Sequence, residues 1–214
     1  MEFLTHEKLF RTKDIMELRA KTNVLVLGLG ALGSNLVPLL IRNGFIKITG
    51  LDFDRIDRHN PANQYFTLTD VGRKKTAILK NKVHRELGVQ IAVIDRRVET
   101  INHNQFRAFD LIIDTFDNWE ARSFVQKVCR ELGTAERLLH IGMSDQGYSE
   151  IKWDNYYNIP EVETEQEDIC EYPLACNLVY NTVSLSAEVI CQYIDNRNQI
   201  NCTFTINDLN ITKL

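Results

Sequence analysis

Hydrophobic and polar positions along this chain alternate between two patterns, one typical of buried strands and one typical of helices. Short apolar runs predict five buried strands, within residues 23–28, 46–54, 89–98, 109–117 and 137–144. Apolar residues at helical spacing predict helices over residues 13–22, 31–43, 70–87 and 118–132, with Asp70 as the N-cap of the third. Strand–helix alternation with short connections predicts an α/β fold, a doubly wound, Rossmann-like and mostly parallel sheet.

The C-terminal part departs from this rhythm. Residues 147–154 alternate like a half-exposed sixth strand, residues 158–173 are acidic and predict a loop, and residues 174–194 predict a buried helix that is apolar nearly all round. One or two short strands follow, so we expect an antiparallel C-terminal extension. The prediction is a single domain over 1–214, with a nucleotide-binding core at about 20–145, a crossover loop at about 155–173 and a C-terminal helix with strands at 174–214.

Charge and cysteine content narrow the functional classes. The net charge of −4 and the pI near 5.8 argue against a broad basic face for nucleic acid. No apolar run is long enough to cross a bilayer and the N-terminus is too charged for a secretory signal, so we expect a cytoplasmic protein without membrane contact. The five cysteines contain no CxxC pair, so neither a disulfide scaffold nor a structural zinc is expected.

A glycine-rich turn follows the first predicted strand. Gly28, Gly30 and Gly33 fit the pattern G-x-G-x-x-G, and a predicted helix begins at Ala31. In such turns the glycines permit a tight turn, close approach of backbone N–H groups to phosphates, and close helix–strand packing. The positive end of the helix favours an anion. Asp52 ends the next predicted strand, where an acid accepts hydrogen bonds from ribose hydroxyls. The turn therefore predicts a nucleotide site, and the alternative is a close-packed turn without a ligand.

The segment after the second predicted strand separates ATP from NAD. Asp52 and Asp54 form an acid-x-acid pair, and then, in order, come Asn60, Gln64, Asp70, Gly72 and Lys75. Later, "DTFDNWEAR" contains Asp117, Asn118 and Arg122. This succession resembles the ThiF/MoeB/HesA and ubiquitin-activating-enzyme superfamily, over residues 8–195.

The resemblance implies ATP-dependent adenylation of a carboxylate, usually the Gly-Gly C-terminus of a ubiquitin-like or sulfur-carrier protein. It implies that Asp52 holds the ribose, that Asn60 and Lys75 meet the phosphates, and that Asp117 faces Mg²⁺. It places Asp54, Gln64 and Asn118 beside the nucleotide. It also implies a homodimer, or a heterodimer with an active homologue.

Each assignment has a structural alternative. Lys75 lies in a charged helical stretch whose residues are typical of a solvated face. Asp117 and Asn118 could cap the helix at 118–132, and Asn60 before Pro61 could be a turn residue. Arg122 could be a structural ion-pair partner.

The sequence departs from the family pattern at three points. Asn63 stands where the family has an arginine before Gln64, which removes a guanidinium near the β- and γ-phosphates. Arg55 or Arg58 are candidates to replace it. The N-terminal segment is short, leaving Arg11 as a weak candidate to reach a partner's site, and the paired CxxC zinc element is absent.

Cys170 is the candidate nucleophile, because it falls near the position where sulfur-transferring or thioester-forming members carry theirs. The acidic neighbours of Cys170 disfavour its thiolate. Cys176 is a weaker candidate, and we expect Cys129, Cys191 and Cys202 in the core.

Two other functions stay open. Asn63 is compatible with a catalytically weakened partner subunit that binds through the surface of "GYSEIKWDNYY", with Trp153, Tyr156 and Tyr157. The glycine turn and Asp52 also allow an NAD-dependent oxidoreductase.

Overall fold

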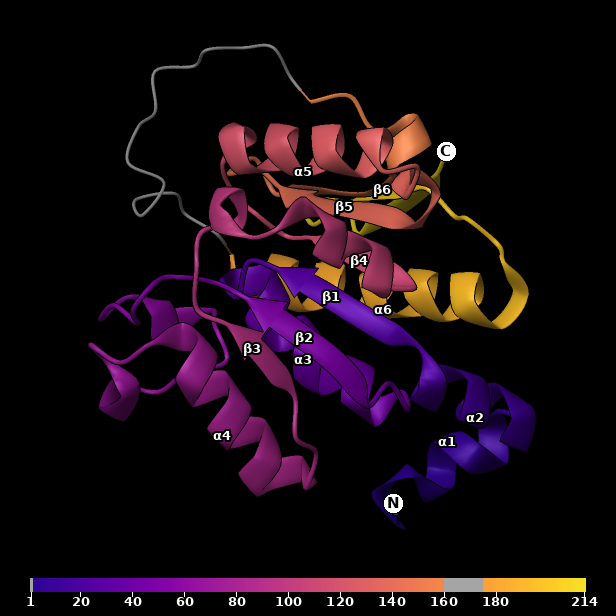
Figure 1. Cartoon of the computed structure of the whole chain (residues 1–214), viewed down its shortest axis with the longest axis horizontal. Coiled ribbons are helices and arrows are strands. Elements are labelled where there is room, and N and C mark those ends of the chain that lie inside the picture. Colours follow the sequence, from indigo (N-terminus) through magenta and orange to yellow (C-terminus); the bar gives the residue numbers. More distant parts are fainter. Residues whose placement is uncertain (1, 160–174) are drawn as a thin grey trace.

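The computed structural model describes residues 2–159 and 175–214, and it contains one mixed sheet (Figure 1). The strand order is β3-β2-β1-β4-β5-β6-β7-β8. The strands are β1 (Asn23–Leu27), β2 (Lys47–Leu51), β3 (Ala92–Ile94), β4 (Leu111–Asp114), β5 (Leu138–Met143), β6 (Tyr148–Trp153), β7 (Cys202–Thr205) and β8 (Asn210–Lys213). The first five run parallel and the last three are antiparallel, which confirms the predicted fold class and its C-terminal extension.

Helices cover both faces of the sheet (Figure 1). The α-helices are α1 (Thr5–Phe10), α2 (Lys13–Lys21), α3 (Ala31–Arg42), α4 (Lys75–Leu87), α5 (Trp119–Glu131) and α6 (Cys176–Asn196). The 3₁₀ helices are η1 (Glu2–Leu4), η2 (Asn60–Ala62), η3 (Leu68–Asp70), η4 (Val98–Thr100), η5 (His103–Ala108), η6 (Ala135–Arg137) and η7 (Asp154–Tyr156). One core cluster joins the sheet to α3, α4 and α6, and a second joins it to α5, η4 and η5.

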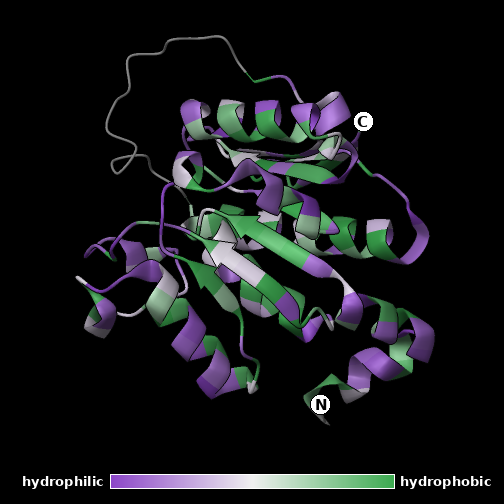
Figure 2. Ribbon diagram, viewed as in Figure 1, coloured by the Kyte–Doolittle hydropathy of each residue, from purple (hydrophilic) through white to green (hydrophobic). Residues whose placement is uncertain are grey.

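The inner parallel strands carry apolar side chains on both faces of the sheet, which explains their central position. Val24 and Val26 of β1 belong to one cluster, while Leu25 and Leu27 belong to the other. All four side chains are fully buried, as expected for a central parallel strand. Figure 2 shows the hydrophobic colour concentrated on the inner strands, while most of α4 has the hydrophilic colour. By contrast β6 alternates between partly and fully buried positions, as the sequence predicts.

Two predicted helices differ from the structure. The helix expected from Asp70 begins instead at Lys75, because Asp70 forms a capping box with Thr67 at η3, so its carboxylate caps a separate short turn. The C-terminal helix is not buried all round, since α6 exposes Tyr180, Ser184 and Glu188 along one stripe. Its opposite face packs on α3 and β6. The predicted loop at 158–173 lies almost wholly outside the described residues.

Candidate functional site

The glycine-rich turn lies between β1 and α3, at the carboxyl edge of the parallel strands. Gly28 has a φ of 87°, a left-handed conformation that favours glycine. A Cβ on Gly33 would lie 1.9 Å from the carbonyl oxygen of Gly28, so only glycine fits this approach of helix to strand. A Cβ on Gly30 would meet no atom within 4 Å, so Gly30 faces open space. The turn is therefore packed at two glycines and open at the one expected to meet phosphate.

Asp52 follows β2 and connects that strand to the glycine turn. Its side chain is buried, with Oδ2 accepting a hydrogen bond from the Leu29 amide at 2.7 Å and Oδ1 accepting from the Asp54 amide at 2.7 Å. Burial raises the pKa of Asp52, and the positive charge of Lys75 opposes that rise. The carboxylate thus fixes two loops at the sheet edge. Its predicted contact with a ribose stays a prediction.

Lys75 is the first residue of α4, and it points back toward the acidic pair. Its Nζ lies 3.1 Å from Oδ2 of Asp54, and its amide donates to the Asp54 carbonyl oxygen at 3.1 Å. The residue is only 7% exposed, so it does not belong to a solvated helix face. A cation in the first turn of a helix opposes the helix dipole. The position of the Lys75 ammonium is therefore explained by nearby anions, of which the Asp54 carboxylate is one.

The loop between β2 and α4 is folded around Asn60. The Asn60 side chain is buried, and its Oδ1 accepts from the Asp57 amide at 2.9 Å, while its carbonyl oxygen accepts from the Gln64 amide at 2.8 Å. Asn60 therefore does stabilise a turn, whatever else it binds. Because Oδ1 of Asn60 is already occupied by the Asp57 amide, the expected contact of Asn60 with phosphate stays a prediction. Within the described residues, the Oε1 atom of Gln64 is buried without a hydrogen-bond partner.

Two polar residues of α3, which the sequence analysis did not single out, hold this loop against the start of that helix. The Nδ2 atom of Asn35 donates to the carbonyl oxygens of Ala31 and Asn63, each at 2.8 Å. Oγ of Ser34 accepts from the Tyr65 amide at 3.0 Å. The available signal is that two buried polar residues interrupt an otherwise apolar helix face.

Of the candidate arginines, Arg55 and Arg58 for the missing guanidinium and Arg11 for a partner's site, two are engaged elsewhere. Nη1 of Arg55 donates to the Gly72 carbonyl oxygen at 2.8 Å, within the same loop. Arg11 contacts Glu188 of α6 at 3.1 Å and Asp195 at 3.9 Å, and it belongs to the helical region around α2 and α6. Arg58 is exposed.

Asp117 and Asn118 follow β4 at the same edge of the sheet. Asn118 is the N-cap of α5, because its Oδ1 accepts from the Ala121 amide at 2.8 Å. The capping alternative is therefore correct for the Asn118 side chain. Asp117 is exposed to solvent beside it. In the parts of the chain that the structure describes, no group of three His, Cys, Asp or Glu side chains could hold a metal ion.

The cysteines divide as the sequence suggests. Cys129, Cys191 and Cys202 are buried, which confirms their placement in the core. Burial raises the pKa of the Cys129 thiol to about 11 and that of Cys191 to about 12. Cys176 is exposed at the start of α6. Cys170, the candidate nucleophile, lies outside the described residues and stays a prediction.

Comparison with known proteins identifies the family. Residues 6–144, well over half of the chain, match the ThiF family. The chain belongs to the ThiF family. A probable molybdopterin-synthase adenylyltransferase of Porphyra purpurea is 30% identical over 160 residues, which cover 70% of this chain and 42% of that protein. The NEDD8-activating enzyme E1 catalytic subunit of Caenorhabditis elegans is 32% identical over 118 residues, covering 54% of this chain and 27% of that one. The matched regions thus span less than half of these relatives.

Solved structures support the fold of this ThiF-family chain. One match is a crystal structure of E. coli MccB with ATP. The superposition covers 94% of this chain and 65% of the MccB chain, with a TM-score of 0.74 and 16% sequence identity. The E. coli tRNA N6-threonylcarbamoyladenosine dehydratase TcdA covers 66% of this chain and 58% of its own, with a TM-score of 0.60 and 22% identity. None of the described helices is long and apolar enough to span a bilayer.

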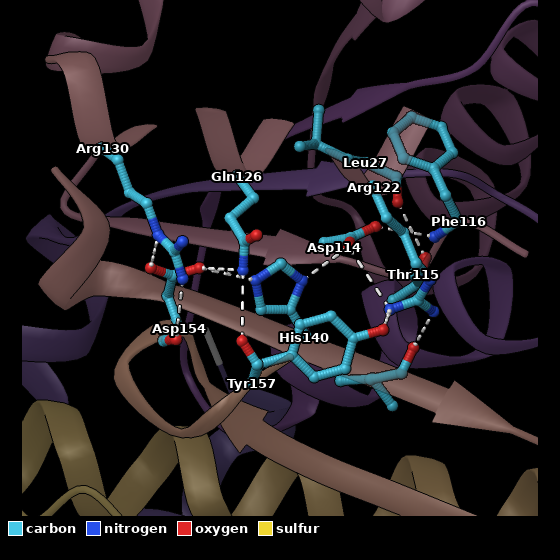
Figure 3. Close-up of polar contacts among 11 residues, drawn as sticks. Leu27, Asp114, Thr115, Phe116, Arg122, Gln126, Arg130, His140, Asp154 and Tyr157 are labelled. Atoms are coloured by element: carbon cyan, nitrogen blue, oxygen red, sulfur yellow. Dashed lines mark hydrogen bonds and ion pairs between the residues drawn. The ribbon is translucent and has the colours of Figure 1, made fainter. Parts of the chain in front are cut away.

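A second polar group, which the sequence analysis missed, is buried between the sheet and α5 (Figure 3). Asp114 ends β4, His140 lies in β5 and Asp154 begins η7. Nδ1 of His140 lies 2.7 Å from Oδ2 of Asp114, and Nε2 lies 3.2 Å from Oδ1 of Asp154. We call these three residues the buried triad. Their separation in the sequence, and the apolar neighbours of His140, explain why no local pattern revealed them.

Arg122 of α5 completes this group. Its Nη1 lies 3.4 Å from Oδ2 of Asp114, its Nη2 donates to the Ile141 carbonyl oxygen at 2.6 Å, and the Tyr157 hydroxyl is 3.3 Å from Nη1. The structural ion-pair alternative is therefore correct for Arg122. Burial opposes the charge of Asp114, but Arg122 and then His140 outweigh it and hold the pKa of Asp114 below its usual value.

The predicted binding surface on "GYSEIKWDNYY" is wrong for two of the three aromatic residues named for it. Trp153 is fully buried against Tyr193, and Tyr157 is buried on His140. Only Tyr156 is exposed. The alternation of β6 explains the error, because Trp153 falls on the inward positions of that strand. A surface hollow of 720 Å³ lies instead beside α5, where Trp119, Gln126 and Arg130 line it.

Proposed function

We propose that this chain binds ATP with Mg²⁺ at the glycine turn and adenylates a carboxylate, at the C-terminus of a ubiquitin-like or sulfur-carrier protein. The observation that carries the proposal is the position of Lys75. Its side chain is nearly buried at the carboxyl edge of the sheet, with Nζ 3.1 Å from Oδ2 of Asp54 and close enough to Asp52 to oppose the rise of its pKa. Ligands of open α/β sheets bind at that edge. Family membership and the names of the relatives support the same chemistry.

The reaction needs charge control, because both reactants are anions. The carboxylate oxygen forms a bond to the α-phosphorus, the bond from that phosphorus to the β-phosphate oxygen breaks, and pyrophosphate leaves. Lys75 would offset negative charge that develops on the α-phosphoryl oxygens, and the N–H groups at the start of α3 would hold the phosphates. Asp52 would accept from the ribose hydroxyls. Asp52 and Lys75 both lie at the carboxyl edge of the sheet, where Asp52 accepts from the Leu29 amide and Lys75 pairs with Asp54.

Asp117 fits a magnesium site of the usual kind. Protein-bound Mg²⁺ is generally held by one or two carboxylates together with phosphate oxygens and water. Asp117 offers an exposed carboxylate directly after β4. Magnesium held there supplies Lewis-acid stabilisation of the phosphate charge. In the loop between β2 and α4, the buried Oε1 of Gln64 has no hydrogen-bond partner among the described residues.

ATP–pyrophosphate exchange tests this function. We expect magnesium-dependent exchange that requires a carrier protein ending in Gly-Gly. Lys75→Ala should lower the exchange rate about 10²–10³-fold, the usual cost of losing one group that stabilises transition-state charge. Lys80→Ala is the matched control, because Lys80 is an exposed lysine of the same helix. Equal activity of the two variants would contradict the proposal.

One observation favours a second function, a catalytically weakened subunit of a dimer. Asn63 carries no charge, and of the two candidate replacements Arg55 is held within its own loop, which leaves the exposed Arg58. If Arg58 does not reach the phosphates, a guanidinium from a homologous subunit would be needed. If exchange is absent alone and appears on mixing with an active homologue, the second function holds. Full activity of the isolated chain excludes it.

A further inference from the structure

The buried triad contains an acid–base group to which the proposed reaction assigns no role. His140 is fully buried, and both of its ring nitrogens face carboxylate oxygens, at 2.7 Å and 3.2 Å (Figure 3). A histidine between two carboxylates is either neutral, with one ring nitrogen facing an acceptor as a lone pair, or charged, with both nitrogens donating. The other hydrogen bonds of the carboxylates decide between these states.

Both carboxylates are ionised: burial opposes their charge, but Arg122 outweighs it at Asp114, and the hydrogen bonds of His140, Arg130 and Gln126 outweigh it at Asp154, so both pKa values lie below the usual value. Oδ1 of Asp114 accepts from the Phe116 amide at 3.0 Å. Oδ2 of Asp154 accepts from Nε of Arg130 at 2.8 Å, and its Oδ1 accepts from Nε2 of Gln126 at 2.8 Å. Ionised carboxylates have no proton to give, so the proton of each short contact has to come from His140. The hydrogen-bond pattern therefore requires a doubly protonated imidazolium.

The charge balance supports the same state. Besides His140, the buried charges of this group are Asp114 and Asp154, both negative, and Arg122, positive. A charged His140 makes this set neutral (−2 + 2 = 0), whereas a neutral His140 leaves one uncompensated buried anion, offset only by the half-exposed Arg130. Burial lowers the pKa of His140, but the hydrogen bonds to Asp114 and Asp154 outweigh it, so the pKa lies above its usual value.

Titratable and charged groups face His140 from several elements. The described elements that contribute them are β4 with Asp114, β6 with Glu150 and Lys152, η7 and its end with Asp154 and Tyr157, and α5 with Arg122, Cys129 and Arg130.

The imidazolium connects two segments that lie far apart in the sequence. On one side, Asp114 accepts from the Phe116 amide and thus shapes the turn that leads to Asp117. On the other side, the Tyr157 ring stacks on the imidazole, with 4.1 Å between ring centroids and 16° between planes. Thr115 then fixes the same turn to the glycine turn, since its Oγ1 donates to the Gly28 carbonyl oxygen at 2.8 Å. The contacts form a continuous path from η7 to the candidate nucleotide site.

We propose that His140 is a positioning residue that is charged at neutral pH, and that its imidazolium fixes the β4 turn carrying Asp117 and holds η7 with Tyr157 against α5. Loss of the proton from Nε2 would release Asp154 first, because that contact is the longer one and Asp154 keeps Arg130 and Gln126 as donors. Gln126 and Arg130 also line the hollow beside α5, which gives this side access to solvent. Only the nucleotide-binding arm of the test rests on the proposed function.

The charge itself is tested by ¹⁵N NMR of the imidazole groups in the full chain. The His140 signal is identified by its loss in His140→Gln. We expect both ring nitrogens of His140 to carry protons at pH 7.5, above the ordinary imidazole pKa of about 6.5. A singly protonated ring at that pH would overturn the proposal. Asp154→Asn, which keeps the side-chain shape, should shift the titration of His140 to lower pH, and an unchanged titration would also contradict it.

The positioning role is tested by hydrogen exchange at the Phe116 amide and by binding of MgATP. In His140→Gln we expect the Phe116 protection factor to fall and the Kd for MgATP to rise about tenfold, as for residues that orient a metal ligand through a partner. In the wild type the Kd should also rise at alkaline pH, and this pH dependence should vanish in the variant. His103→Gln is the matched control, because His103 is exposed and packs only its ring edge on Phe124.

Unchanged protection of Phe116 in a folded His140→Gln protein would refute the positioning role. If the wild type itself binds no MgATP, the proposed function fails instead. In that case the NMR and exchange results still decide whether His140 is charged and whether it orders the turn.

Discussion

The two polar regions of this molecule differ in how they are built and in how visible they are in the sequence. At the sheet edge, Asp52, Asp54 and Lys75 lie within 24 consecutive residues (75 − 52 + 1 = 24), and each follows a strand or begins a helix. In the buried triad, partners come from β4, β5 and η7 and meet only in the folded sheet. Asp52 and Lys75 are themselves nearly buried, but they lie at the carboxyl edge of the sheet, where ligands of open α/β sheets bind. The triad lies between the sheet and α5 and satisfies its short contacts internally. The two regions therefore differ in their place in the fold rather than in burial, and we infer that the edge group serves a ligand while the triad serves the structure.

The largest expected effect is a difference in the free energy of unfolding between variants of the buried triad and variants of the sheet edge. Asp114→Ala leaves the buried Arg122 and His140 without their anion, so we expect the free energy of unfolding to fall by about 3–5 kcal/mol. Asp117→Ala removes an exposed carboxylate and should change the free energy of unfolding by no more than about 0.5 kcal/mol. Urea unfolding of both variants measures the difference. Similar losses for the two would break the distinction between edge and interior.

The glycine turn allows a similar separation within one motif. Gly33→Ala places a methyl group against the Gly28 carbonyl oxygen, and we expect it to lower the free energy of unfolding by about 1–3 kcal/mol. Gly30→Ala meets open space and should unfold like the wild type, yet weaken MgATP binding because the methyl group crowds the phosphates. Thermal unfolding together with nucleotide titration checks both. A stable Gly33→Ala variant would contradict the close packing seen here.

The smallest effect concerns pH. The folded-state pKa of His140 lies above its unfolded value, so its stabilising contribution is fully present below the unfolded pKa of about 6.5. As pH rises through the folded pKa, that contribution is lost. We therefore expect the free energy of unfolding to decline on the alkaline side, and the decline to be smaller in His140→Gln. Denaturation curves between pH 6 and pH 10 would show it, and identical pH profiles would argue for a neutral histidine.

Sequence reasoning succeeded where structure is local. The apolar runs of β1 and β4, the spacing of Gly28, Gly30 and Gly33, and the cap at Asn118 depend on neighbours within a few residues. The start of α4 was misplaced, because Asp70 caps η3 through Thr67 instead. The buried triad escaped prediction because a histidine in an apolar strand gives no sign of the carboxylates that strand pairing brings to it. The inward side of Trp153 was missed for a related reason, since the binding surface was inferred from its composition.

Equilibrium binding of ATP in the presence of Mg²⁺, followed by calorimetry, tests the central claim most directly. The account predicts that the wild type and Lys80→Ala bind MgATP alike, that Lys75→Ala and Asp117→Asn bind it much more weakly, and that NADH does not compete. Tight binding of NADH without binding of ATP, or full MgATP affinity in Lys75→Ala, would contradict it.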